Sequence, residues 1–320
     1  MNGKPVISAP AKSIINFKSG FRHKLLCDGP TFMAGTACPF SCTYCYVEEL
    51  MRKSPHLKSI EQKHWQVVIR RVGALDTMRR QLTDRRGNPK FKDPAEMRVI
   101  YASPLVDVGA NLELARETID LCKIILEFTH WQIRLLSKST FLPFIADALE
   151  QFPGLRARQR VIYGVSTGTL NNRIASAIEE GCPLVSRRIE SFHRLQDSGF
   201  RTFGMVCPNL PESDYLEFSK KILSAIRVER LEQVWAEVIN VRGESMIRTV
   251  SVLMQAGFPL EAAAFQKVTM HKDAWEQYVR STLEAHATRC PPNKLRFLQY
   301  VNKANRFWWE QQQSRGAVLL

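Results

Sequence analysis

Apolar, strand-like runs alternate with helix-like segments between residues 31 and 239, and this alternation constrains the fold more than any other feature of the sequence. The expected strands are 31–35, 98–103, 132–137, 161–166, 201–206 and 233–239. The expected helices are 43–53, 111–128, 141–151, 171–180, 186–198 and 213–227. Strands that alternate with helices form parallel sheets through right-handed crossovers. Six such strands predict an α/β fold, a partial (β/α)6 barrel of the TIM type.

The alternation stops near residue 241, and the pattern beyond it indicates helices at 245–257, 272–288 and 293–313. At the other end, the first 29 residues contain few apolar runs and include the basic positions Lys12, Lys18, Arg22 and Lys24, which predicts an extended arm. We therefore divide the chain into an N-terminal basic arm (1–29), a barrel (30–240, with a basic insertion at 52–98) and a helical C-terminal region (241–320).

Three closely spaced cysteines, Cys38, Cys42 and Cys45, follow the first expected strand. The spacing Cys-x3-Cys-x2-Cys suits thiolates that hold a 4Fe-4S cluster. Such a cluster normally takes one thiolate for each iron, so three ligands leave one iron open to an outside molecule. An open metal position separates a chemical site from a structural one. The motif therefore predicts a cluster that takes part in a reaction.

The alternative for the same cysteines is a structural zinc ion, with Cys27 or His23 as the fourth ligand. Structural zinc sites usually consist of two well-separated ligand pairs. The remaining cysteines are isolated from one another along the chain, at positions 27, 122, 182, 207 and 290. The spacing favours the cluster over zinc.

Composition is that of an intracellular globular protein. The chain has 320 residues, of which 45% are hydrophobic, and this length supports a large core. Its eight cysteines are scattered, which is typical of a reducing compartment and not of a disulfide framework. The sequence shows no apolar run typical of a secretory signal or a transmembrane helix. We expect a cytoplasmic protein that does not enter membranes.

The net charge of +14 favours a polyanionic partner. Residues 52–98 concentrate this charge, with thirteen Lys or Arg and five Asp or Glu. A basic surface of this kind attracts nucleic acid through its phosphates. A solvated basic face that maintains solubility is the alternative. The charge predicts a nucleic-acid partner, and DNA is the favoured polymer.

Polar residues stand where three expected strands end, at Ser103, Lys138 and Ser166. The carboxyl ends of parallel strands in a barrel meet on one face. Each of these residues alone would be an ordinary turn residue. Their coincidence at three strand ends predicts a polar site next to the cysteines.

The cysteine motif resembles the signature of the radical S-adenosylmethionine (SAM) enzymes, in which SAM occupies the open iron. Residues 30–240 resemble more narrowly the spore photoproduct lyase-like branch of that superfamily. The matching segments are Cys38–Tyr46, the strand ending at Ser103, Ser137-Lys138-Ser139, Val165-Ser166-Thr167, Arg194-Leu195 and Cys207-Pro208-Asn209-Leu210-Pro211.

The resemblance implies a role for each matched residue. Cys38, Cys42 and Cys45 would hold the 4Fe-4S cluster. The SAM contacts would come from Tyr44, Ser103, Lys138 and Ser166. The tyrosines that match Tyr44 and Tyr46 lie beside the radical route in that branch, which makes Tyr46 the candidate catalytic residue.

The implied reaction is cleavage of SAM to a 5′-deoxyadenosyl radical that abstracts hydrogen from a substrate. The implied electron source is a donor of the flavodoxin or ferredoxin type. A nucleic-acid substrate, in DNA repair or base modification, agrees with the basic charge. The alternatives are a radical SAM enzyme that modifies a peptide or protein, and a zinc-stabilised nucleic-acid-binding protein without catalysis.

One departure from the lyase pattern concerns the hydrogen donor. The lyase carries a donor cysteine immediately before the serine that matches Ser103, and here Ala102 stands at that position. Pro104 replaces the acidic residue that follows the serine in the lyase. Cys207, at the end of another expected strand, is the substitute donor, although a cysteine in an apolar strand is commonly a packing residue.

Overall fold

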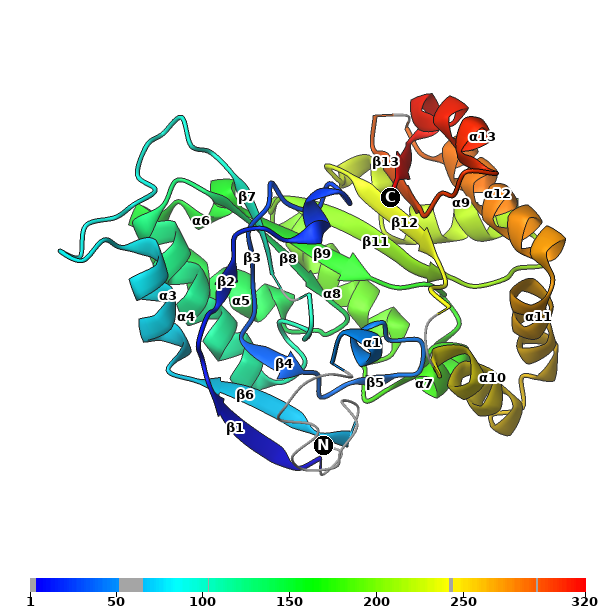
Figure 1. Cartoon of the computed structure of the whole chain (residues 1–320), viewed down its shortest axis with the longest axis horizontal. Coiled ribbons are helices and arrows are strands. Elements are labelled where there is room, and N and C mark those ends of the chain that lie inside the picture. The colour runs from blue at the N-terminus through cyan, green and yellow to red at the C-terminus, as the bar shows by residue number, and fades with distance from the viewer. Residues whose placement is uncertain (1–3, 52–65, 103, 242–243, 292) are drawn as a thin grey trace.

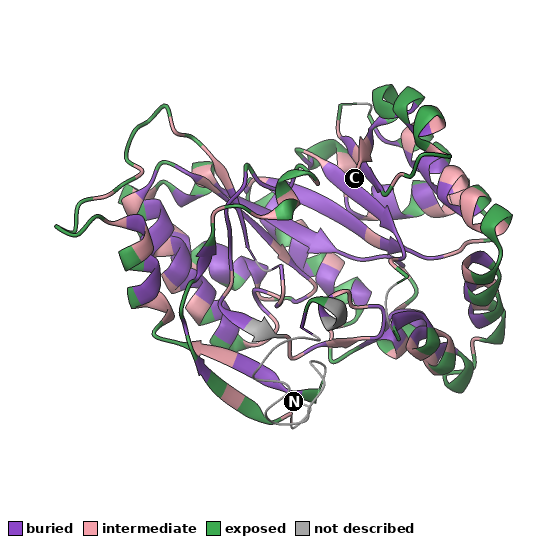
Figure 2. Ribbon diagram, viewed as in Figure 1, coloured by how far each residue is buried: buried purple, intermediate pink, exposed green. Residues whose placement is uncertain are grey.

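A nine-stranded sheet forms the centre of the molecule, with strand order β14-β13-β12-β11-β9-β8-β7-β3-β2 (Figure 1). The computed structural model describes residues 4–51, 66–102, 104–241, 244–291 and 293–320. Helices pack against the sheet, and Figure 2 shows that the strands are buried while the outer helix faces are exposed. This arrangement confirms the expected α/β class.

The six expected strands are neighbours in this sheet and pair in parallel. They are β3 (Thr31–Phe32), β7 (Val99–Ala102), β8 (Gln132–Ser137), β9 (Val161–Ser166), β11 (Thr202–Asn209) and β12 (Val234–Val238). All six residues of β9 are buried, as expected for a central strand covered on both faces. The partial barrel is therefore confirmed.

Helices connect successive strands of the barrel, close to the expected positions. They are α4 (Leu112–Phe128), α5 (Leu142–Glu150), α7 (Asn172–Ile178), α8 (Val185–Asp197) and α9 (Tyr215–Ala225). Side chains cap their first turns: Asn111 Oδ1 accepts from the Leu114 amide at 2.8 Å, and Asp214 Oδ1 accepts from the Glu217 amide at 2.9 Å. Asn111 and Asp214 therefore determine where α4 and α9 begin.

The sheet continues into the C-terminal region, where β13 (Leu295–Gln299) and β14 (Ala317–Leu319) extend it in parallel beyond β12. The helix expected over 293–313 is therefore wrong, and only α13 (Arg306–Gln311) forms within it. Over five residues, apolar side chains at Leu295, Phe297 and Leu298 satisfy a strand and a helix equally well. The edge of β12 provides backbone partners for a strand, and those pairings decide the outcome.

Helices α10 (Ser245–Gln255) and α12 (Lys272–Arg289) form as expected, and α11 (Pro259–Met270) lies between them. Buried hydrogen bonds attach α12 to the strand ends. His286 Nε2 donates to Asn209 Oδ1 at 2.7 Å, and its Nδ1 accepts from the Ser219 hydroxyl at 3.0 Å. The Tyr278 hydroxyl donates to the Asn209 carbonyl and accepts from the Ile239 amide. These contacts fix α12 beside β11 and β12. The division of the chain at residues 30 and 241 stays a prediction.

The expected N-terminal arm contributes two strands. β1 (Val6–Pro10) pairs in parallel with β6 (Val68–Val72), which also pairs with β4 (Gly35–Ala37). β2 (Ile15–Asn16) pairs antiparallel with β3 and forms one edge of the main sheet. Residues of the predicted arm therefore pair with the main sheet and with the three-stranded sheet β1-β6-β4.

The basic insertion divides into parts with different surroundings. Residues 52–65 lie outside the described residues, β6 and α3 (Ala74–Leu82) follow, and residues 83–98 form an exposed loop that leads directly into β7. Phe91 of this loop bridges to Thr129, which also precedes a strand, β8. The loop therefore lies at the amino ends of the strands, opposite the edge where the expected site residues stand.

No helix among the described residues is long and apolar enough to span a membrane.

Candidate active site

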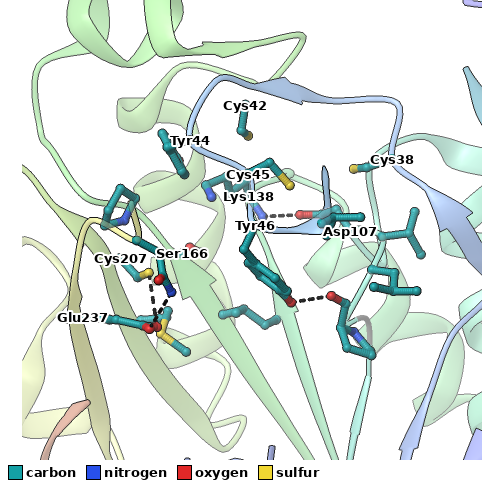
Figure 3. Close-up of a pocket in the computed structure, with 18 of the residues that line it drawn as sticks. Cys38, Cys42, Tyr44, Cys45, Tyr46, Asp107, Lys138, Ser166, Cys207 and Glu237 are labelled. Carbon is teal, nitrogen blue, oxygen red and sulfur yellow. Dashed lines mark hydrogen bonds between the residues drawn. The ribbon is translucent and has the colours of Figure 1, made fainter. Parts of the chain in front are cut away.

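One pocket at the carboxyl ends of the strands brings the expected site residues together (Figure 3). Its lining includes Cys38, Cys42, Tyr44, Cys45, Tyr46, Lys138 and Ser166. Ser103, the remaining expected SAM contact, lies outside the described residues. The pocket is open at its mouth and encloses a cavity of about 190 Å³.

The cysteine loop is held on both sides by side chains from distant segments. Lys4 Nζ donates to the Cys38 carbonyl at 3.4 Å and to the Phe40 carbonyl at 3.3 Å. On the other side, Arg248 Nη2 donates to the Thr43 carbonyl at 2.9 Å. A turn in which the Cys45 amide donates to the Cys42 carbonyl precedes α1 (Val47–Met51). The backbone that carries the three thiols is therefore fixed by the fold.

The chemistry of the donor set fits an iron–sulfur cluster. Among the described residues, no three His, Cys, Asp or Glu side chains come together closely enough to hold one ion. Thiolates of a four-iron cluster each bind a different iron, so they lie around the cluster and not around one point. Three thiols in the wall of one pocket meet that requirement.

Electrostatics around the thiols also agree with a cationic group in the pocket. Burial raises the pKa of Cys38, and burial raises the pKa of Cys45 to about 11. A hydrogen bond from Cys182 lowers the pKa of Cys42, and Lys138 contributes in the same direction. Buried thiols with raised pKa values ionise when a metal supplies the compensating charge.

The zinc alternative lacks its expected fourth ligand. Cys27 is buried among Leu26, Phe203 and Trp235, and His23 is exposed. Cys182 is the thiol that lies next to the motif, with its sulfur 4.0 Å from that of Cys42.

A buried carboxylate, Glu179, organises the part of the pocket nearest Cys42. Glu179 is 3% exposed and lies at the end of α7, where β10 (Glu179–Glu180) pairs with β5 (Ser41–Cys42). It accepts a hydrogen bond from the Tyr44 hydroxyl, and its oxygens lie 2.6 Å from Arg188 Nη1 and 3.7 Å from Lys138 Nζ. Lys138 also lies 5.1 Å from the centroid of the Tyr44 ring. Glu179 therefore holds two of the expected SAM contacts, Tyr44 and Lys138, side by side.

Charge in this cluster keeps Lys138 protonated. Burial acts to lower the pKa of Lys138, but the Cys42 thiolate and the Glu179 carboxylate outweigh burial, and the pKa is raised. With Arg188 nearby, two cations lie beside the Glu179 carboxylate and the Cys42 thiolate. Lys138 is the point charge of this cluster that suits an incoming carboxylate.

Asp107 fixes the backbone from which Lys138 extends. Its carboxylate accepts from the Ser137 hydroxyl at 2.6 Å, the Lys138 amide at 2.7 Å and the Gly109 amide at 2.9 Å. Burial raises the pKa of Asp107, although these hydrogen bonds oppose the effect. An added Cβ at Gly109 would lie 2.5 Å from Ser139 Oγ, so the loop needs glycine to approach this closely.

The wall of the pocket opposite the cysteine loop carries a fourth thiol, that of Cys207, beside Glu237 (Figure 3). The sulfur of Cys207 lies 3.9 Å from Glu237 Oε2, and Lys24 Nζ donates to both oxygens of that carboxylate at 2.9 and 3.1 Å. Burial raises the pKa of Cys207 to about 12, so it is a neutral thiol at physiological pH. An added Cβ at Gly168 would lie 1.8 Å from the Pro208 carbonyl oxygen, so this glycine permits the strand end that presents Cys207.

Aromatic side chains line the mouth of the pocket between the two walls. Phe21 stacks on Tyr101 with centroids 5.4 Å apart, and Tyr46 lies 6.4 Å from Phe21. The Tyr46 hydroxyl donates to the Pro104 carbonyl. The mouth therefore offers flat apolar surfaces next to the polar group formed by Lys24 and Glu237.

Several solved structures of one enzyme share this arrangement of strands and helices. Spore photoproduct lyase with bound AdoMet and dinucleoside spore photoproduct superposes with a TM-score of 0.55 and 11% identity. That match covers 91% of this chain and 81% of the lyase chain. The lyase complexed with dinucleoside spore photoproduct gives a TM-score of 0.54 and 10% identity over 91% and 82% of the two chains. The fold is that of spore photoproduct lyase.

Sequence comparisons add one distant relative. The uncharacterised protein ORF301 of Acidianus two-tailed virus is 22% identical over 260 residues, covering 79% of this chain and 81% of the viral protein. No family model matches the chain. The expected resemblance to spore photoproduct lyase is thus confirmed at the level of the fold.

Four residues of the site were missed by sequence reasoning: Glu179, Cys182, Arg188 and Glu237. Glu179 and Cys182 stand in the segment Glu-Glu-Gly-Cys, which has the composition of a solvated turn. Their importance depends on the pairing of β10 with β5, which joins segments far apart in the sequence. No local pattern indicates that contact.

Proposed function

We propose that this chain is a radical SAM enzyme that acts on a nucleic-acid substrate. The observation that carries the proposal is the pocket of Figure 3, where three thiols and three of the four expected SAM contacts line one cavity within the lyase fold. When bound, the 4Fe-4S cluster and SAM would supply a 5′-deoxyadenosyl radical that removes hydrogen from the substrate. The side chains of the pocket would bind SAM and the substrate, orient them toward each other and exclude water.

The cofactor side of the pocket is the wall formed by the cysteine loop, Glu179 and Lys138. Cys38, Cys42 and Cys45 would hold the cluster. Lys138 would bind the SAM carboxylate as a point charge, and Tyr44 and Ser166 would provide further contacts. Glu179 keeps Lys138 and Tyr44 in place before SAM arrives, so less conformational entropy is lost on binding.

The substrate side is the opposite wall, with the aromatic mouth. Phe21 and Tyr46 offer stacking surfaces for bases, which are typically worth about 1–3 kcal/mol for each base. Spore photoproduct lyase is complexed with a dinucleoside spore photoproduct in one of the matching structures. The aromatic mouth and the net charge of +14 support a nucleic-acid substrate here.

Cys207 is the proposed hydrogen donor, since Ala102 replaces the donor cysteine of the lyase pattern. Its S–H bond would break and a C–H bond would form on the substrate radical, which leaves a sulfur radical on Cys207. One electron from a donor of the flavodoxin or ferredoxin class and one proton would restore the thiol. The raised pKa of Cys207 supports this role because a thiolate has no hydrogen atom to give.

The test is anaerobic reconstitution of the full chain with iron and sulfide, followed by reduction with dithionite and addition of SAM. We expect about one four-iron cluster for each chain and release of 5′-deoxyadenosine, both lost in Cys42→Ala. DNA, RNA and a basic peptide are then compared as stimulants of turnover. Stoichiometric zinc without iron uptake or SAM cleavage would overturn the proposal.

A further inference from the structure

Cys42 has a thiol partner that the proposed chemistry does not use. The sulfur of Cys182 lies 4.0 Å from the sulfur of Cys42, although 140 residues separate them in the chain. No disulfide joins the two in the structure, and all eight cysteines are free. The pair therefore consists of two reduced thiols in contact.

Backbone pairing on both sides keeps these thiols together. Cys42 is in register with Glu179 in the β5–β10 ribbon, and the Thr43 amide donates to the Ile178 carbonyl at 2.9 Å. After β10, the chain turns through Gly181 at φ 84°, and the Cys182 amide donates to the Glu179 carbonyl at 3.0 Å. The contact results from this turn and is not a chance meeting of two mobile side chains.

The surroundings of the pair suit thiol chemistry better than packing. A buried cysteine that only fills space stands among apolar groups, as Cys122 does in α4. Cys42 and Cys182 instead lie beside the ionic cluster of Glu179, Lys138 and Arg188. The 4.0 Å contact between the two sulfurs and this ionic setting distinguish the pair from cysteines that only pack.

We propose that Cys42 and Cys182 form a reversible disulfide in the cluster-free protein, and that this bond withholds one cluster ligand. The two S–H bonds are lost and one S–S bond forms, while two electrons and two protons pass to a small-molecule disulfide, which becomes two thiols. A dithiol reverses the exchange and releases Cys42. The oxidation of Cys42 stops at the disulfide and does not continue to irreversible sulfur acids.

The second half of this proposal, that Cys42 is a cluster ligand, rests on the proposed function. The first half does not, because the disulfide requires only the two thiols. The experiment therefore measures thiols and iron separately.

The test uses the full-length protein without its cluster, treated with oxidised glutathione under anaerobic conditions. Wild type should lose two of its eight free thiols without retaining glutathione, and fragmentation should link Cys42 to Cys182. Cys182→Ser should lose none through this pair, and Cys290→Ser, which changes a buried cysteine of the C-terminal region, should behave as wild type. Oxidised wild type should take up little iron until a dithiol is added. Cys182→Ser should take up the same amount of iron before and after the dithiol is added.

Wild type that keeps all eight thiols free, or that joins Cys42 to Cys38 or Cys45, would overturn the proposal. Equal iron uptake by oxidised and reduced wild type would overturn the claim that the disulfide withholds a cluster ligand. If the disulfide forms but the reduced protein takes up no iron, the proposed function fails and the disulfide stands. Circular dichroism of Cys182→Ser verifies that the variant is folded.

Discussion

The ammonium of Lys24 lies 2.9 Å from a carboxylate oxygen of Glu237, although 213 residues separate the two in the chain. The side chains are 18% and 10% exposed, so this ion pair is largely shielded from water. It attaches the N-terminal arm to the end of β12, at the mouth of the pocket. The Trp235 indole N–H, which donates to the Lys24 carbonyl at 2.8 Å, strengthens the same attachment.

Replacing Lys24 should destabilise the protein more than replacing an exposed lysine of the same arm. Lys24→Met leaves the Glu237 carboxylate buried without its main partner, and such losses typically cost about 2–5 kcal/mol. We expect Lys24→Met to lower the free energy of unfolding by about 2–3 kcal/mol in urea titrations. Lys18→Met, at an exposed position, should change it by less than about 0.5 kcal/mol. Equal effects of the two variants would contradict the role given to the ion pair.

Cys207→Ser should separate SAM cleavage from hydrogen transfer. A hydroxyl holds its hydrogen more strongly than a thiol, so the substrate radical would form but would not be quenched. We expect 5′-deoxyadenosine release to continue while repaired or modified product falls at least about tenfold, about 1.4 kcal/mol in activation free energy. Chromatography of both products from one reaction provides the measurement. A product yield that matches wild type would remove Cys207 from the mechanism.

Lys138→Gln should weaken SAM binding to the reconstituted enzyme. The substitution removes the charge that faces the SAM carboxylate and leaves Arg188 to neutralise Glu179 alone. We expect the dissociation constant for SAM to rise at least about tenfold, about 1.4 kcal/mol, in equilibrium dialysis. Lys220→Gln, on the exposed face of α9, serves as the control. Unchanged affinity with an intact cluster would place the SAM carboxylate elsewhere.

Acid should destabilise the fold through His286. Burial lowers the pKa of His286 to about 4 from its ordinary value of 6.5, so the folded protein keeps this ring neutral where the unfolded chain protonates it. The contribution of the neutral His286 ring to the free energy of unfolding is complete above pH 6.5 and is lost as the pH falls toward about 4. The total loss is about 3 kcal/mol.

The measurement is the free energy of unfolding of wild type and His286→Gln at pH 7 and pH 5. The variant should be less stable at pH 7, and its stability should fall less between the two pH values than that of wild type. His271→Gln, at an exposed position, should retain the wild-type pH dependence. Identical pH dependence in wild type and His286→Gln would show that another group dominates.

The exposed basic loop 83–98 allows the predicted nucleic-acid binding to be tested separately from SAM cleavage. Replacing the exposed residues Arg85, Arg86 and Lys92 with Gln should weaken DNA binding. If all three contact phosphates, the slope of log K against log salt should become shallower by about 2–3, since each contact contributes about 0.9. SAM cleavage without DNA should stay at the wild-type rate, because the loop lies at the opposite edge of the sheet.

A matched control replaces Arg187, Lys220 and Lys221, which are equally basic but pair with glutamates on their own helices. This second variant should bind DNA as wild type does. If both triple variants lose affinity equally, total charge and not the loop determines binding.

Sequence patterns located the barrel well because its strands are buried on both faces. For β8 and β9, the expected ranges coincide with the observed strands. An apolar run of six residues bounded by polar residues is too short for a typical helix and therefore favours a buried strand. The short run at β13 was assigned to a helix because its partner, β12, lies about 60 residues earlier and leaves no local trace.

The candidate site divides in the same way. Cys38, Cys42 and Cys45 identify themselves by spacing, whereas Glu179 and Cys182 gain their significance from a ribbon between distant segments. A buried glutamate also reads as a surface residue in any composition-based analysis. Local reasoning therefore identifies the cluster motif and misses the residues that support it.

The main sheet ends in β14 on one side and in the antiparallel strand β2 on the other, so it is a curved wall with two rims and not a ring. A ring would accept only molecules that pass through its mouth, and a polymer would have to present a free end or a flipped-out unit. For the proposed nucleic-acid substrate, a sheet with two rims would not require a free end to be threaded into it. Interior positions of a long strand would then be as accessible to the proposed chemistry as its termini.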